Sequence, residues 1–107
     1  MVAGDVLRGD MPLVHWNSRE EGFLLDVRQP EEFRLGHIPG AKLIPLGELS
    51  RRIGEVPTGR EIVCICATGH RSVPAVHKLE AAGYTASSMK NGMIAWYLAK
   101  LPTNAGH

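Results

Sequence analysis

Residues 61–74 read EIVCICATGHRSVP, and the change of pattern within this stretch decides the fold. Glu61 to Cys66 is short, apolar and bounded by turn residues, which predicts a buried strand. Gly69 marks a loop, and Ser72 followed by Pro74 predicts an N-cap and the first turn of a helix. We therefore expect a strand, a loop and a helix in direct succession, with Cys66 where the strand ends.

The same alternation of strand and helix patterns continues on both sides of this stretch. Residues 23–27 (FLLDV) form an almost continuous apolar run, which is typical of a parallel strand buried on both faces. Residues 30–35 begin with proline and two acids, as helices often do. Further strands are expected at 13–16, 42–44 and 85–89, and further helices at 46–54, 72–82 and 93–100. Together these patterns predict an α/β domain with a mostly parallel sheet.

A chain of 107 residues fits one small domain with its own core. We expect an irregular lead-in over residues 1–12, the domain itself over 13–101 and a flexible tail over 102–107. The net charge of +1 argues against a nucleic-acid or membrane-surface partner, since both need concentrated basic charge. No apolar run approaches the roughly 20 residues that span a bilayer, and the N-terminus lacks a signal pattern. These features predict a cytoplasmic location.

Two cysteines, Cys64 and Cys66, lie two positions apart. A disulfide between them would close almost no loop, so a disulfide-stapled scaffold is not expected. His70 is the one nearby candidate for a third metal ligand, and structural zinc needs four, so no metal site is expected. Cys64 is expected to be a core side chain.

The loop that follows Cys66 carries the expected chemistry. Successive backbone N–H groups in such a loop converge into an anion-binding nest, and the following helix directs its positive end to the same place. Both effects favour the nucleophilic thiolate of Cys66. Arg71 adds a planar cation that suits oxyanions. The expected anion-binding residues are Ala67, Thr68, Gly69, His70, Arg71 and Ser72. A buried, inert Cys66 is the alternative interpretation.

Asp26 lies inside an apolar strand, so its carboxylate needs a partner. Arg28 or nearby backbone N–H groups could supply one, and we expect these two residues to support the site structurally. His37 is expected to be a structural turn histidine. His70 lies inside the loop, where it either assists an anionic sulfur or points into solvent.

Three ordered segments resemble the signatures of the rhodanese family: LLDVRQPEEFRLGHIPGA (24–41), CATGHRS (66–72) and NGMIAW (91–96). The resemblance covers about residues 13–100. It implies a three-layer α/β/α fold with a central, mostly parallel sheet of about five strands, and a sulfurtransferase that works by a ping-pong reaction. Cys66 would carry sulfane sulfur as a persulfide, taken from thiosulfate or a persulfide and passed to a thiol or cyanide. The loop 67–71 would form the cradle.

Two details of the resemblance bear on the substrate. Four residues separate Cys66 from Arg71. The related phosphatases have five, so the shorter loop favours sulfur over phosphate, and a phosphatase or arsenate reductase is the weaker alternative. Asn91 stands where the family commonly has glycine, and asparagine tolerates the positive φ that such a turn needs.

The lead-in GDVLRGD (4–10), followed by Val14, His15 and Trp16, resembles the segment that joins flavin-dependent coenzyme A-disulfide reductases to a rhodanese domain. A flavin-dependent disulfide reductase or another sulfur carrier is therefore a candidate partner. No cofactor is expected on this chain, because the reductase portion is absent from it. A non-catalytic protein-interaction module of the same family is the other alternative.

Overall fold

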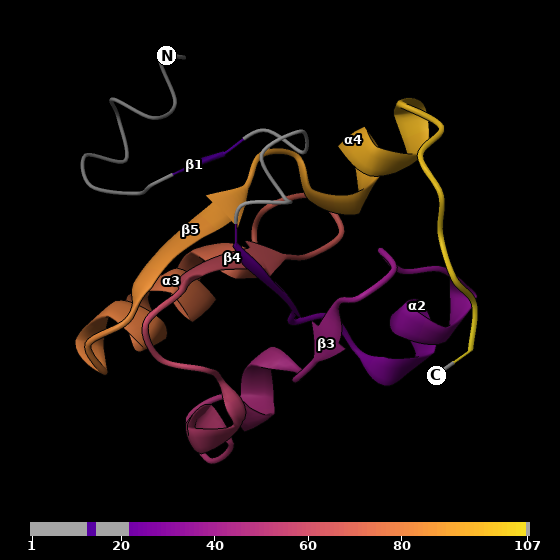
Figure 1. Cartoon of the computed structure of the whole chain (residues 1–107). Coiled ribbons are helices and arrows are strands. Elements are labelled where there is room, and N and C mark those ends of the chain that lie inside the picture. The colour runs from indigo at the N-terminus through magenta and orange to yellow at the C-terminus, as the bar shows by residue number, and fades with distance from the viewer. Residues whose placement is uncertain (1–12, 15–21, 107) are drawn as a thin grey trace.

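The computed structural model describes residues 13–14 and 22–106, which form a five-stranded sheet (Figure 1). All neighbouring strands pair in parallel, in the order β1-β5-β4-β2-β3. The strands are β1 (Leu13–Val14), β2 (Phe23–Asp26), β3 (Lys42–Leu43), β4 (Glu61–Ile65) and β5 (Thr85–Met89). The parallel α/β sheet expected from the sequence is confirmed. Because the strands are parallel, the loops after β2, β4 and β5 leave the sheet at one common edge.

Strand β4 occupies the centre of the sheet, and its side chains alternate between two cores. Ile62 and Cys64 belong to one buried cluster, which also contains Cys66. Val63 and Ile65 belong to the other. The central strand is thus buried on both faces, as its continuous apolar sequence indicates.

One helix packs on each of these cores. Helix α3 (Ser72–Ala81) contacts β5 and β4 and buries Val76 and Leu79 in the first cluster. Helix α4 (Gly92–Leu98) buries Met93 and Trp96 in the second cluster. The chain therefore has the three-layer α/β/α arrangement. Helix α2 (Pro30–Leu35) follows β2 and begins with the expected proline and acids.

The helix expected over residues 46–54 is wrong. The structure has two short 3-10 turns there, η2 (Leu46–Glu48) and η3 (Ile53–Glu55). Leu49 and Val56 are fully buried against the sheet, so the apolar spacing reflects packing rather than a continuous helix. Gly47 and Gly54 lower the local helix propensity.

The C-terminal residues lie against α2 and the turn after it rather than extending from the domain (Figure 1). Asn104 forms an antiparallel bridge with His37, and the Gly106 N–H donates to the Arg34 carbonyl at 2.8 Å. Residues 102–106 thus contact the domain, and the flexibility expected of this tail stays a prediction. The lead-in 1–12 and residues 15–16 of the expected first strand lie outside the described residues. Within residues 13–14 and 22–106, no helix has the length and apolarity needed to cross a membrane.

Candidate active site

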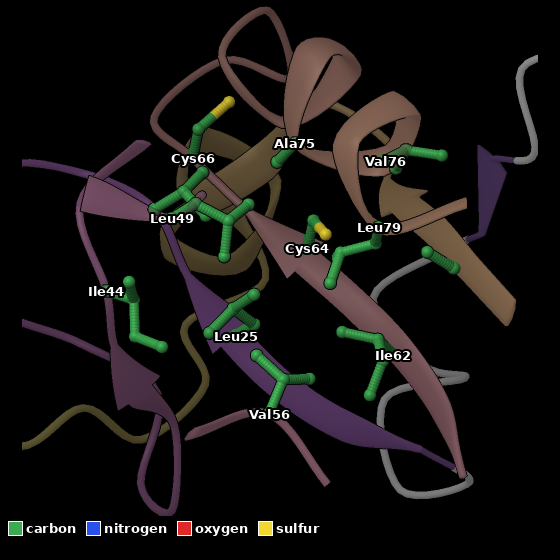
Figure 2. Close-up of a cluster of buried hydrophobic side chains, with 12 residues drawn as sticks. Leu25, Ile44, Leu49, Val56, Ile62, Cys64, Cys66, Ala75, Val76 and Leu79 are labelled. Carbon is green, nitrogen blue, oxygen red and sulfur yellow. The ribbon is translucent and has the colours of Figure 1, made fainter. Parts of the chain in front are cut away.

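Cys66 follows the central strand at the edge where the parallel strands end, and its sulfur lies under the loop that leads to α3. The Gly69 N–H donates to Cys66 Sγ at 3.0 Å. Figure 2 shows the sulfur turned away from the apolar side chains Leu25 and Ile62, whereas Cys64 lies among them. Cys66 is only 1% exposed, so a reagent must displace part of the loop to reach it.

Ser72 does not have the N-cap position that the sequence predicted. Arg71 is the N-cap, with αR backbone angles, and Ser72 is the first residue of α3. This places the Ser72 hydroxyl beneath the loop: its Oγ lies 3.6 Å from Cys66 Sγ and donates to the Gly69 carbonyl at 3.0 Å. Its third partner is the Ser88 hydroxyl on β5. The sequence analysis did not single out Ser88.

Arg71 is held by α2. Its guanidinium forms a bidentate ion pair with Glu32, with N–O distances of 2.6 and 2.8 Å. Hydrogen bonding from Arg71 is the main cause that lowers the pKa of Glu32 to about 2. The same hydrogen bonds raise the pKa of Arg71. The cation that we expected to face a substrate anion is therefore neutralised by a carboxylate from a different segment.

Thr68 and His70 lie on the outer, exposed side of the loop. Thr68 Oγ1 and His70 Nδ1 are 3.3 Å apart. Neither side chain has a hydrogen bond to Cys66 Sγ in the part of the chain that the structure describes. Ala67 is half-buried, and its carbonyl accepts a hydrogen bond from Ile94 N at 3.0 Å.

The N-terminus of α4 fixes the same loop from the other side. The Met93 N–H donates to the Cys66 carbonyl at 2.8 Å. Gly92 lies so close to the loop that a Cβ there would be 2.1 Å from the Cys66 carbonyl oxygen. Asn91 adopts the expected left-handed conformation, with φ 61°. Sequence reasoning identified the Asn91-Gly92 turn but not its contact with the Cys66 loop.

Asp26 and Arg28 form a buried ion pair at the end of β2, which is a direct neighbour of β4. Arg28 Nη2 lies 2.8 Å from Asp26 Oδ2, and the Arg28 backbone N–H also donates to this carboxylate. Burial acts to lower the pKa of Arg28, but the hydrogen bonds and charge of Asp26 outweigh it and the pKa is raised. Nη2 also donates to the Gly36 carbonyl at 2.8 Å. The pair thereby ties β2 to the end of α2.

Cys64 points into the same core face as Cys66 but has no access to solvent (Figure 2). Burial raises the pKa of the Cys64 thiol to about 12. Two features therefore distinguish the cysteines: Cys66 has hydrogen-bond partners in a loop, and Cys64 is enclosed by apolar side chains. Of the two, Cys66 is the one placed for chemistry.

Comparisons with known proteins agree with this geometry. The Rhodanese-like domain family matches residues 13–99. The chain is 34% identical over 85 residues to the putative sulfurtransferase YtwF of Bacillus subtilis, covering 79% of this chain and 82% of that protein. It is 40% identical over 85 residues to the HTH-type transcriptional regulator Rv0324 of Mycobacterium tuberculosis, covering 78% of this chain but only 38% of the regulator.

A solved structure, the reduced CoADR-RHD of Bacillus anthracis, superposes with a TM-score of 0.79 at 32% identity. The similarity covers 88% of this chain and 18% of that one. Similar domains thus occur both as nearly whole proteins and as parts of longer ones. The match over most of the chain, together with the loop geometry, shows that this chain belongs to the rhodanese-like domain family.

Proposed function

We propose that this chain is a sulfurtransferase that carries sulfane sulfur as a persulfide on Cys66. The observation that carries the proposal is the position of Cys66. The residue directly follows the central strand, and its Sγ lies beneath a loop and accepts a hydrogen bond from the Gly69 N–H at 3.0 Å. A hydrogen bond from a backbone N–H stabilises an anionic acceptor more than a neutral one. A relative of nearly the same length is named a putative sulfurtransferase, which supports the same reaction class.

The proposed reaction balances without an external oxidant. The Cys66 thiolate attacks the outer sulfur of a donor R–S–S⁻, forms a new S–S bond and releases R–S⁻. With thiosulfate as the donor, the leaving group is sulfite. An acceptor thiolate then attacks the outer sulfur of the Cys66 persulfide, forms its own persulfide and restores the Cys66 thiolate. Cyanide would leave as thiocyanate in the same step.

Access is the demanding part of this reaction, because Cys66 is almost completely covered. The outer sulfur of a persulfide extends about 2 Å beyond Sγ. Because Cys66 is covered by the loop 67–71, we expect this loop to open when the donor arrives and to close again around the persulfide. Gly69 has φ 101°, a conformation that glycine adopts without strain.

The experiment that tests the proposal is mass spectrometry after incubation with thiosulfate, mercaptopyruvate or glutathione persulfide. We expect one added sulfur atom on Cys66, which cyanide removes. Cys66→Ala must lose the adduct, while the matched variant Cys64→Ala two residues away must keep it. Failure of every donor to load folded protein with an intact Cys66 would refute the proposal.

A non-catalytic interaction module is the second candidate, and one observation favours it: Cys66 is 1% exposed. In that case partner binding would survive Cys66→Ala, and no donor would produce turnover. A sulfur carrier or a flavin-dependent disulfide reductase is the partner class we propose in either case. A thiol-dependent sulfur relay suits a reducing compartment, so we propose the cytoplasm as its location.

A further inference from the structure

A second serine lies behind the active-site loop, on strand β5. Ser88 is fully buried, and its hydroxyl is hydrogen-bonded to the Ser72 hydroxyl. In the described part of the chain, Ser88 Oγ has no other hydrogen-bond partner. A buried hydroxyl costs free energy unless it is paired, so this single contact determines how Ser88 is oriented.

A count of hydrogens shows what the contact does. A serine hydroxyl has one hydrogen to donate and two lone pairs that accept. Ser72 Oγ has three neighbours: Cys66 Sγ, the Gly69 carbonyl and Ser88 Oγ. The carbonyl can only accept, so Ser72 donates to Gly69 when Cys66 is a thiol. The two lone pairs of Ser72 are then filled by the hydrogens of Cys66 and Ser88.

The count changes when the Cys66 sulfur becomes an anion. The sulfur then has no hydrogen and can only accept, so Ser72 can bond to it only by turning its own hydrogen from the Gly69 carbonyl to the sulfur. Ser88 still donates to Ser72 in this arrangement. Among these three neighbours Ser88 is then the one that can donate to Ser72, so without it both lone pairs of Ser72 would be unfilled in the core and its hydrogen would be less well directed.

We propose that Ser88 is a positioning residue: by donating to Ser72 Oγ, it leaves the single Ser72 hydrogen free to turn to Cys66 and thereby stabilises the anionic sulfur. For the persulfide, this inference rests on the function proposed above. For the thiolate, it stands on the hydrogen-bond geometry alone and is tested without any sulfur transfer.

Several charged or titratable groups surround Cys66 and must be kept constant in the test. Arg71 is paired with Glu32, His70 lies on the exposed side of the loop, and Asp26 on β2 is paired with Arg28. Cys64 is on β4, two residues before Cys66. Substituting Ser88 changes none of these groups, so a change in the ionisation of Cys66 reports the hydroxyl.

The experiment is the pH dependence of Cys66 alkylation by iodoacetamide in the full chain, with Cys64 and Cys66 separated by fragment ions. Loop opening affects the rate at every pH, whereas thiolate formation sets the pH midpoint. We expect Ser88→Ala to move the midpoint upward by about half a pH unit, or about threefold slower alkylation at a pH below it. Ser88→Thr keeps the hydroxyl and should restore the wild-type profile.

Ser87 provides the matched control. It precedes Ser88 on β5, is equally buried at 1% exposed, and hydrogen-bonds to Glu61 on the opposite face of the sheet. Ser87→Ala should leave the midpoint unchanged. An unchanged midpoint in folded Ser88→Ala would overturn the inference, as would an equal shift in Ser87→Ala or, if Ser88→Ala does not fold, a shifted midpoint in Ser88→Thr. A shift specific to Ser88→Ala in a protein that no donor can load would refute the proposed function but support this inference.

Discussion

The contact between Gly92 and the Cys66 loop makes Gly92→Ala a sharp test of how the loop is held. A Cβ at position 92 would lie 2.1 Å from the Cys66 carbonyl oxygen and 2.8 Å from the Ala67 carbonyl carbon. Both contacts are with backbone, so no side chain can rotate away to relieve them. The residue also has φ +55°, a conformation that costs an L-residue about 1–2 kcal/mol.

Gly83 separates these two causes. It has φ +93°, but an added Cβ would meet nothing within 4 Å. Gly83→Ala should therefore cost only the backbone strain, about 1–2 kcal/mol. Gly92→Ala adds overpacking of about 1–3 kcal/mol and weakens two hydrogen bonds worth about 1 kcal/mol each. We expect Gly92→Ala to be the more destabilising by about 2–4 kcal/mol.

Urea unfolding followed by circular dichroism measures this difference. With a slope of about 2 kcal/mol per M, the midpoint of Gly92→Ala should lie about 1–2 M below that of Gly83→Ala. The entropy that alanine removes from the unfolded chain is common to both variants and cancels. Gly92→Ala should also lose persulfide loading in conditions where it is still folded, while Gly83→Ala retains it. Equal midpoints and equal loading would show that the close approach does not hold the loop.

Four further predictions concern the charged groups and the second thiol. Glu32→Gln frees Arg71 from its ion pair, so loading of Cys66 by thiosulfate, a dianion, should rise relative to loading by a persulfide whose organic group is uncharged. An unchanged ratio of the two loading rates would contradict this. Because the pKa of Glu32 falls from 4.5 to about 2 on folding, the ion pair stabilises the fold above pH 4.5, and this stabilisation is lost as the pH falls through about 2. Partial exposure of the pair limits the stabilisation to about 1 kcal/mol. The urea midpoints of wild type and Glu32→Gln should therefore converge near pH 2. Asp26→Asn should cost about 3–5 kcal/mol because it leaves Arg28 buried without its partner, and the double variant with Arg28→Met should cost less than the sum of the single changes in urea unfolding. Cys64→Ala should cost about 1 kcal/mol of stability through its lost packing while leaving alkylation of Cys66 unchanged.

The elements that sequence reasoning found are those with strong local signals. The strand before Cys66 is short, apolar and bounded, and the proline and acids at residues 30–32 mark a helix start, so both could be placed from sequence alone. Residues 46–55 misled because Leu49 and Val56 have helix-like spacing but are buried by the sheet. Periodicity reports which side chains are buried, and only indirectly which backbone buries them.

The missed site residues are those whose contacts cross long distances in the sequence. Glu32 meets Arg71 from 39 positions away, and Ser88 meets Ser72 from 16 positions away. No local sequence pattern around Glu32 or Ser88 indicates which residue it contacts. An alternating strand pattern could have placed Ser88 on the Cys66 face, because Ala86, two residues earlier, packs in the same cluster as Cys66. The pairing with Ser72 also depends on α3 beginning one residue earlier than expected, because Arg71 is the N-cap and Ser72 is the first residue of the helix.

The contact between α4 and the Cys66 loop also gives a structural reason for the third sequence signature, residues 91–96, which lies far from Cys66 in the sequence. The carbonyls of Cys66 and Ala67 are both hydrogen-bonded to N–H groups of α4. In a trans peptide the N–H points opposite to the carbonyl, and the described chain has no cis bonds. The N–H groups of Ala67 and Thr68 therefore point away from α4 and stay unused by it. Peptide groups whose carbonyls are held in this way can return to the same orientation once the loop has closed, so their N–H groups can stabilise a bound anion without a free cation. Since Arg71 is already paired with Glu32, we expect the backbone rather than the guanidinium to supply most of the stabilisation of the proposed persulfide on Cys66.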